Sequence, residues 1–197
     1  MLELGVGYGR VARALIGDGW SVVGVDRSAP LLEDARRRLP PDRFTGLLSD
    51  VASLDLGRTF PVVLAPFHVL NHAEDGAALQ HMLRRVRAHL HSDGLFAFDL
   101  RFPTVWTGPP RRTVGTLTRR GVRIPWEEST VFDVRQQREL SALRIGGQPA
   151  VCLAHRYVMP AELEDQLDRA GLRVTGMWGG FAGEALGDGP SIVVTAT

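Results

Sequence analysis

The sequence contains one cysteine, no lysine and no long apolar run. A single cysteine, Cys152, excludes an internal disulfide and a cysteine-rich metal site, so no metal ligands are expected. No apolar stretch approaches the ~20 residues that a membrane-spanning helix needs, and the first residues lack the features of a secretory signal. The predicted location is therefore the cytoplasm, with no membrane as partner.

The chain also lacks an excess of either charge, because 23 basic and 22 acidic residues leave a net charge of +1. Such a balance gives no reason to expect nucleic acid or an anionic membrane surface as the main partner. With 197 residues, 44% of them hydrophobic, the chain is expected to form one globular domain over residues 1–197.

The most informative stretch is the glycine-rich loop that follows the first apolar residues. Gly5, Gly7 and Gly9 allow a tight turn and a close approach of the backbone to a ligand. Asp26 ends the next predicted strand, about 20 positions later, where a carboxylate can accept hydrogen bonds from ribose hydroxyls. The pattern of strand, glycine loop, helix, strand and acidic end predicts a nucleoside-cofactor site.

The spacing of the glycines bears on which cofactor this is. A dinucleotide-binding loop has the pattern G-x-G-x-x-G, whereas this chain has G-x-G-x-G with Arg10 at the sixth position. A site for a pyrophosphate is therefore disfavoured. An NAD-dependent oxidoreductase remains an alternative because Asp26 suits that class too.

The runs E-L-G-V-G-Y-G-R and V-V-G-V-D-R-S resemble the first two motifs of class I S-adenosylmethionine (SAM)-dependent methyltransferases of the small-molecule type. The resemblance implies SAM as cofactor, transfer of a methyl group to an amine or hydroxyl of a small metabolite, and a homodimer as one option. It places a set of residues around the cofactor, namely Glu3, Gly5, Gly7, Gly9, Asp26 and Arg27.

The first strand looks short, because only Met1 and Leu2 precede Glu3. Methyltransferases of the resembled class carry helices ahead of this strand, and the chain is expected to lack them. A non-catalytic SAM-binding or interaction protein is therefore a further alternative.

Strands and helices alternate through the first hundred residues, which predicts a Rossmann-like, doubly wound and mostly parallel sheet. Phe60–Ala65 is expected as a strand whose start is irregular, because Pro61 removes a hydrogen-bond donor. The following helix is expected to include Leu90 and to end at Asp93-Gly94, before a strand over residues 95–100.

Two further segments complete the candidate site. Asp50 and Val51 follow the predicted third strand, and the resembled family uses this position to bind the adenine ring. Phe67, His68 and His72 follow the fourth strand, where open α/β sheets bind ligands beyond the carboxyl ends of their strands. Phe67 is expected beside the cofactor, and His72, with His68 as second choice, is the candidate catalytic base.

The pattern changes after Arg101. Residues 101–157 contain short extended runs at 113–118, 122–126, 130–134 and 151–157, which predict an antiparallel β insertion on the substrate side. A helix from Pro160 to about Gly171 and two strands at 173–178 and 191–196 follow. The last two strands are expected to form a C-terminal antiparallel hairpin, as in class I methyltransferases.

Overall fold

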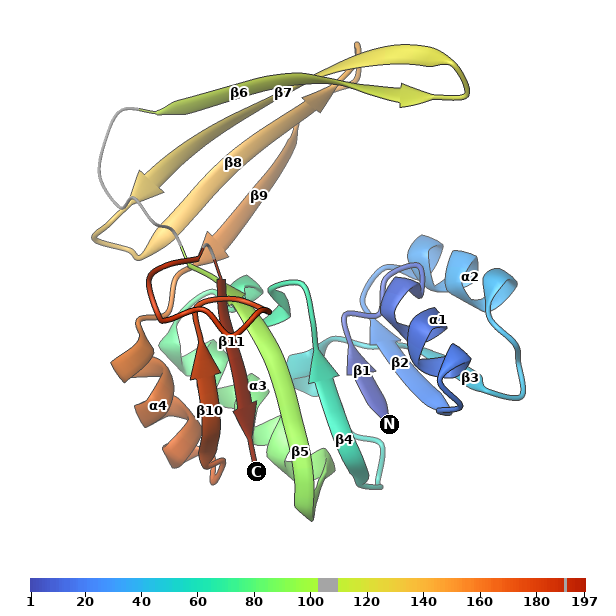
Figure 1. Ribbon diagram of the computed structural model, residues 1–197, viewed down its shortest axis with the longest axis vertical. Coiled ribbons are helices and arrows are strands. Elements are labelled where there is room, and N and C mark those ends of the chain that lie inside the picture. Colours follow the sequence, from blue (N-terminus) through green and yellow to red (C-terminus); the bar gives the residue numbers. More distant parts are fainter. Residues whose placement is uncertain (103–109, 190) are drawn as a thin grey trace.

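The computed structural model describes residues 1–102, 110–189 and 191–197, and two β-sheets dominate it (Figure 1). The central sheet has seven strands in the order β10-β11-β5-β4-β1-β2-β3. These strands are parallel except β11, which is antiparallel to its neighbours β5 and β10. The strands are β1 Leu2–Leu4, β2 Val22–Asp26, β3 Phe44–Leu48, β4 Phe60–Ala65, β5 Leu90–Arg101, β10 Val174–Trp178 and β11 Ser191–Ala196. The predicted fold class is confirmed.

Helices cover this sheet through two separate apolar clusters. The larger cluster joins Leu83 and Leu163 from two helices to the buried strands β1, β4, β5 and β11. The smaller one joins Ala12 and Leu32 to Phe44 of β3. The helices are α1 Arg10–Gly17, α2 Ala29–Arg38, α3 Gly76–His89 and α4 Pro160–Arg169, with short 3-10 turns η1 Val51–Ser53 and η2 Val69–His72. None of the helices in the described part of the chain has the length and apolar character that a membrane crossing requires.

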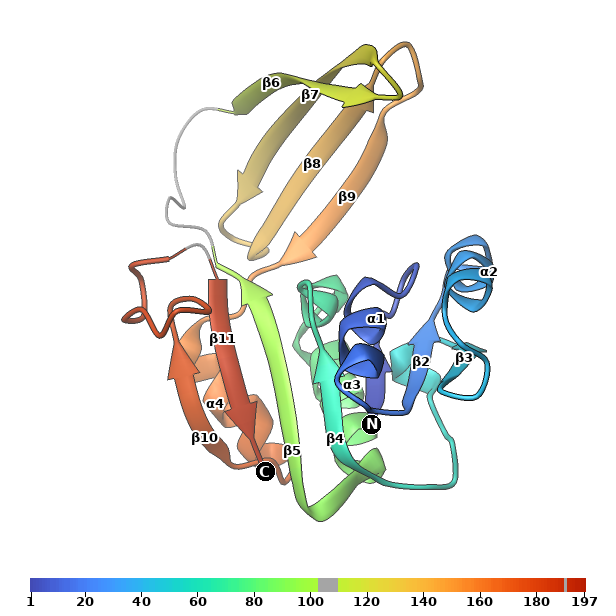
Figure 2. The same cartoon turned by 45° about the vertical axis from the view of Figure 1, so that its right-hand side comes forward.

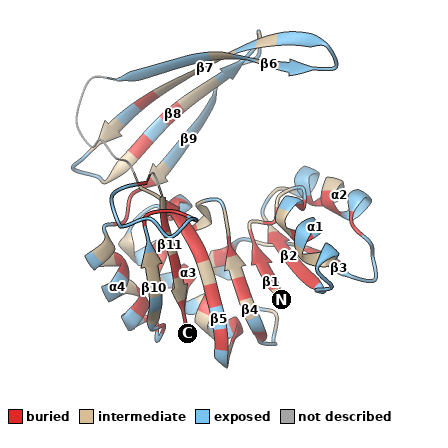
Figure 3. Cartoon of the chain, viewed as in Figure 1, coloured by how far each residue is buried: buried red, intermediate tan, exposed pale blue. Residues whose placement is uncertain are grey.

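The alternation of burial along the strands follows this arrangement (Figure 3). In β11 every second residue is fully buried, and the residues between them are half-exposed. In β1, by contrast, all three residues are buried, because β2 and β4 flank it in the middle of the sheet. The short first strand is thus an interior strand of the sheet, next to the central strand β4.

The entry into β5 differs from the prediction. Helix α3 ends at His89, and Leu90 already pairs with Phe60 of β4, so Asp93-Gly94 lies inside the strand. The next pair is Val62 with Leu95, so the ladder contains an irregularity around Pro61. The irregular start of β4 is as expected, because proline cannot donate the ladder hydrogen bond.

A second, four-stranded antiparallel sheet lies beyond the end of β5 (Figure 2). Its strands are β6 Arg111–Arg119, β7 Val122–Asp133, β8 Arg138–Ile145 and β9 Val151–Arg156, in that order across the sheet. The predicted run 122–126 and residues 130–133 of the predicted run 130–134 belong to the single strand β7. Strand β8 was not predicted.

Buried polar contacts join the two sheets where the chain leaves β5 and returns from β9. The Asn71 side chain accepts from the Arg101 N–H at 2.9 Å, and its Nδ2 donates to the carbonyls of Arg101 at 3.3 Å and Arg156 at 2.6 Å. Arg101 Nη2 also lies 2.9 Å from Oε1 of Glu139, which is 1% exposed. Because a buried amide or carboxylate is costly without partners, these contacts fix the position of the second sheet.

Candidate functional site

The glycine loop is held in place by the acidic residue at the end of β2. Asp26 Oδ2 accepts a hydrogen bond from the Gly7 N–H at 2.7 Å, and its Oδ1 accepts from the Ser28 N–H at 2.8 Å. A carboxylate oxygen has two acceptor positions, so both oxygens can still accept bonds from a ligand. Asp26 therefore joins the loop to the mouth of the site and keeps capacity for ribose hydroxyls.

Gly5 shows why the loop needs glycine. Its φ is +68°, in the left-handed region, and a Cβ built on it would lie 2.5 Å from Cγ2 of Val69. Val69 begins η2, after the end of β4, so the loop and this segment touch at Gly5. Any larger residue would push the two apart.

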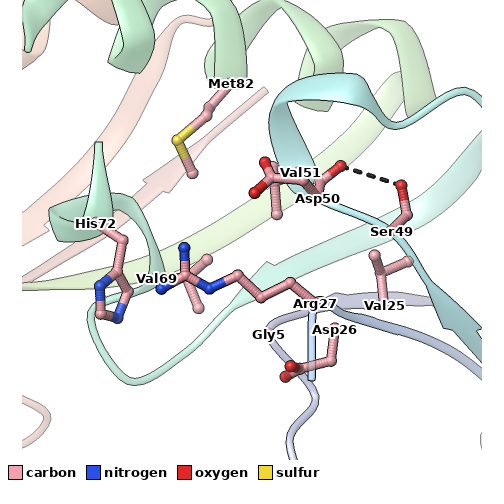
Figure 4. Close-up of a pocket in the computed structure, with 10 residues that line it drawn as sticks. All are labelled: Gly5, Val25, Asp26, Arg27, Ser49, Asp50, Val51, Val69, His72 and Met82. Atoms are coloured by element: carbon pink, nitrogen blue, oxygen red, sulfur yellow. Dashed lines mark hydrogen bonds between the residues drawn. The ribbon is translucent and has the colours of Figure 1, made fainter. Parts of the chain in front are cut away.

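A cleft of about 210 Å³ opens beside this contact (Figure 4). Six residues predicted for the site line it, namely Gly5, Asp26, Arg27, Asp50, Val51 and His72. Val25, Ser49, Val69 and Met82 complete the lining. The structure thus brings together residues from the carboxyl ends of β1, β2, β3 and β4, as a parallel sheet requires.

Asp50 stands at the start of η1 on the wall of this cleft. Its Oδ1 accepts from the Ala52 N–H at 2.8 Å, which orients the carboxylate. Val51 beside it is buried. The pair offers a fixed acceptor and a backbone N–H at the cleft wall.

Glu3 is placed differently, because it lies inside the sheet and not on the cleft wall. The residue is 1% exposed, and its Oε2 has no hydrogen-bond partner among the described residues. Burial raises the pKa of this carboxyl to about 7, against the charge of Arg10 and a backbone hydrogen bond at Ala12, which lower it. A buried acid with a free oxygen next to a glycine loop is able to receive a cationic ligand group.

The segment after β4 has an unusual backbone. Phe67 and His68 have φ values of 64° and 61°, a conformation that costs non-glycine residues free energy. Asp99 of β5 holds both residues: its Oδ1 accepts from the Phe67 N–H at 2.7 Å, and its Oδ2 lies 3.0 Å from His68 Nε2. Asp99 is 3% exposed and does not end its strand in solvent. We therefore regard it as the residue that sets the shape of this turn.

Phe67, Gly7 and Gly9 lie outside the lining of the cleft. The Phe67 ring is 64% exposed, with the Arg10 guanidinium 4.0 Å from its centre. Gly9 precedes α1 at φ 84°, where a Cβ would lie 2.6 Å from Leu39 Cδ1. The Gly7 N–H donates a hydrogen bond to Asp26 Oδ2.

His72 faces a second cleft as well as the first. This second cleft, of about 400 Å³, lies along β9 of the antiparallel sheet and shares Arg27 and His72 with the first. The His72 and His155 rings are 4.9 Å apart between centres. Burial, Arg27 and His68 lower the pKa of His72, while Asp26 opposes them. Burial and the neighbouring His72, Arg101 and His68 lower the pKa of His155 to about 4.

Comparison with known proteins identifies the chain. A family model described as a methyltransferase domain matches residues 1–94. The cypemycin N-terminal methyltransferase of a Streptomyces species is 28% identical over 193 residues, covering 93% of this chain and 76% of that protein. The CcbJ methyltransferase structure from Streptomyces caelestis matches with a TM-score of 0.87 at 27% identity, over 99% of this chain and 86% of that one. The chain is a class I SAM-dependent methyltransferase.

A further solved structure supports this fold. The SAM-bound CalS10, an amino pentose methyltransferase from Micromonospora echinaspora, has a TM-score of 0.78 at 20% identity, covering all of this methyltransferase and 82% of CalS10. The cofactor of the methyltransferase is SAM, and the NAD alternative is set aside.

Three residues outside the predicted site shape the second cleft and the turn beside it. Asp99 is buried and holds Phe67 and His68, and Arg138 of the unpredicted β8 lines the second cleft. Asn71 joins the ends of β5 and β9. All three act through contacts with residues distant in the sequence, so no local pattern could have marked them.

Proposed function

We propose that this methyltransferase transfers the methyl group of SAM to an amine of a small metabolite. The main observation behind this proposal is that His72, whose imidazole can accept a proton, lines both clefts. The names of two similar proteins, an N-terminal methyltransferase and an amino pentose methyltransferase, favour nitrogen over oxygen as the acceptor atom. A hydroxyl acceptor is the second candidate.

The residues of the first cleft fit SAM. In our proposal Asp26 binds the ribose hydroxyls, and Asp50 with the Val51 N–H binds the adenine ring. Gly5 lets the methionine part approach the backbone, with Glu3 beneath the loop as a partner for its ammonium group. The free Oε2 of buried Glu3 and the place of Gly5 on the cleft lining are the observations that favour this arrangement.

The second cleft is the proposed place for the acceptor. It lies between η2 and strand β9, so the insertion at 101–157 would supply the substrate-side wall of a single domain over 1–197. Because this wall comes from a separate sheet, the acceptor can be bound without any rearrangement of the residues of the parallel sheet that we propose bind the cofactor. This division assigns donor binding to the central sheet and acceptor choice to the antiparallel one.

Bound SAM supplies a methyl carbon on a sulfonium, which is electrophilic without further activation. The protein must then orient the acceptor in line, an effect that can reach about 7–11 kcal/mol, and remove a proton from an ammonium group. His72 is the proposed proton acceptor. Its lowered pKa keeps the ring neutral at neutral pH, so Nδ1 or Nε2 is free to take the proton.

His72→Ala tests this role. Turnover should fall by about 10²–10⁴-fold at neutral pH and much less at high pH, where the amine loses its proton unaided. SAM affinity by calorimetry should stay unchanged. Product formation is followed by mass spectrometry with a panel of amines and matched alcohols, and His81→Ala, on the exposed side of α3, is the control.

A loss that does not vary with pH, or a larger loss from His68→Ala, would remove the base role from His72. Methylation of the alcohols alone would show that oxygen is the acceptor atom. NAD binding in place of SAM binding would contradict the cofactor assignment itself.

A further inference from the structure

The second cleft contains more positive charge than its surroundings neutralise. Three arginines line it, Arg27, Arg138 and Arg156, and Glu74 is the acidic residue of the lining. Arg27 lies where the second cleft meets the first, and its guanidinium extends toward the His72 ring (Figure 4).

Only one of these arginines has a carboxylate partner. Arg156 is 8% exposed and is paired through Nη2 with Oε1 of Glu162, and it also donates to Gln137 at 3.0 Å. Arg138 donates to the backbone carbonyl of Glu74 at 2.6 Å, which does not cancel its charge. The Arg156 charge is therefore matched, and the Arg138 charge is not.

Two carboxylates adjoin Arg27 and Arg138, but neither forms an ion pair with them. Asp26 is oriented by two backbone N–H groups, and Asp133, the cross-strand neighbour of Arg138, accepts from the Gln136 N–H at 3.0 Å. Within residues 1–102, 110–189 and 191–197, the ion pairs at 4.0 Å or less include neither Arg27 nor Arg138. Two unmatched guanidinium groups thus line one concave surface.

One titratable group of the lining responds to this charge. Burial first, and the Arg27 charge second, lower the pKa of His72. A ligand with only a protonated amine would be repelled by such a lining. A guanidinium instead suits planar or tetrahedral oxyanions, which it can bind through two parallel hydrogen bonds.

We propose that Arg27 and Arg138 form an anion subsite that binds a carboxylate or phosphate group of the methyl acceptor. This inference rests on the proposed function, because it places the acceptor in the second cleft. The acceptor is then an amine that also carries an anionic group. Binding of that group offsets the charge of Arg27 and Arg138 and holds the amine beside His72.

The test uses two simple anions as probes, inorganic phosphate and acetate, added to the protein saturated with S-adenosylhomocysteine. Binding is followed by NMR through the side-chain Nε–H signals of the arginines. We expect saturable binding of at least one anion, weakened about tenfold or more by Arg138→Gln and by Arg27→Gln. Arg123→Gln, on the exposed far end of β7, is the matched control and should bind as the parent does. Phosphate binding without acetate binding would identify a phosphate acceptor, and the reverse a carboxylate.

Three results would overturn the subsite. The first is no saturable binding of either anion, and the second is equal binding by Arg138→Gln and the parent. The third is loss of S-adenosylhomocysteine binding in Arg27→Gln with no change in anion binding, which would assign Arg27 to the cofactor alone. Methylation of amines that lack an anionic group would leave the proposed function intact, whereas failure to bind SAM would contradict that function and not the anion subsite.

Discussion

Asp99→Ala perturbs the turn that joins the two clefts without touching either lining. The carboxylate is 3% exposed and holds the Phe67 N–H and the His68 ring, two residues with left-handed backbones. Val69 follows directly and lies against Gly5, and both line the cleft that we propose binds SAM. A change at Asp99 should therefore reach SAM binding through the backbone.

The sizes of the opposing effects can be compared. A hydrogen bond to a charged group contributes about 1.5–3 kcal/mol, and a strained non-glycine backbone costs about 1–3 kcal/mol per residue. The two contacts of Asp99 thus nearly offset the strain of Phe67 and His68. When the two contacts are removed, the turn can relax. The strain energy that is released then offsets part of the lost free energy of unfolding. We expect a net loss of about 1–3 kcal/mol in the free energy of unfolding.

SAM affinity should fall about tenfold or more in the Ala variant, because Val69 no longer rests on Gly5. Asp99→Asn keeps an acceptor for the Phe67 N–H and should bind SAM more tightly than Asp99→Ala. Calorimetry with SAM and urea unfolding measure both quantities, and Asp93→Ala, exposed in the same strand, is the control. If Asp99→Ala binds SAM as the parent does, the turn does not position the cleft and the reasoning is wrong.

Three further predictions concern the cofactor side. Asp26→Ala should weaken SAM binding at least tenfold by calorimetry, because both the ribose acceptor and the Gly7 contact are lost, and parental affinity in a variant of unchanged melting temperature would contradict the ribose assignment. Gly5→Ala should lower the free energy of unfolding by more than about 1 kcal/mol and weaken SAM binding, since φ is +68° and Val69 blocks the Cβ. Adding Val69→Ala should restore part of the loss, and no restoration would contradict the contact between the two residues. Because folding raises the Glu3 pKa from 4.5 to about 7, the native state loses stability as pH rises through this range. Glu3→Gln should gain up to about 3 kcal/mol over the parent between pH 5 and 8 in urea unfolding, and a difference that stays constant with pH would refute the shift.

Local patterns in the sequence account for the first cleft, which we propose binds SAM. The glycine loop, Asp26 and Asp50 each follow a strand whose apolar run is evident, and parallel strands bring such ends together. Their positions could therefore be predicted without knowing any long-range contact. The alternation of apolar strands and amphipathic helices likewise predicts the order of these elements through Ala65.

The second cleft, which we propose binds the methyl acceptor, depends on contacts that no local pattern shows. Strand β8 carries Glu139 and Ser141 at its buried positions, so its alternation looks like that of a polar loop. Strand β7 continues through two adjacent glutamates, which read as a break between two strands. Asp99 is buried because Phe67 and His68, about 30 positions earlier, use its oxygens. Burial of polar groups by distant partners is the common reason for these misses.

The same polar contacts explain how the two halves stay in register. Asn71 is buried and bonded to Arg101 and Arg156, which are the last residues of β5 and β9. His72 is the next residue, so one side chain fixes both its position and that of strand β9. An apolar residue at position 71 would leave the N–H and carbonyl groups of two strand ends unsatisfied, at about 1–3 kcal/mol each. The central sheet and the antiparallel sheet are therefore held in a fixed position relative to the imidazole that we propose accepts the proton.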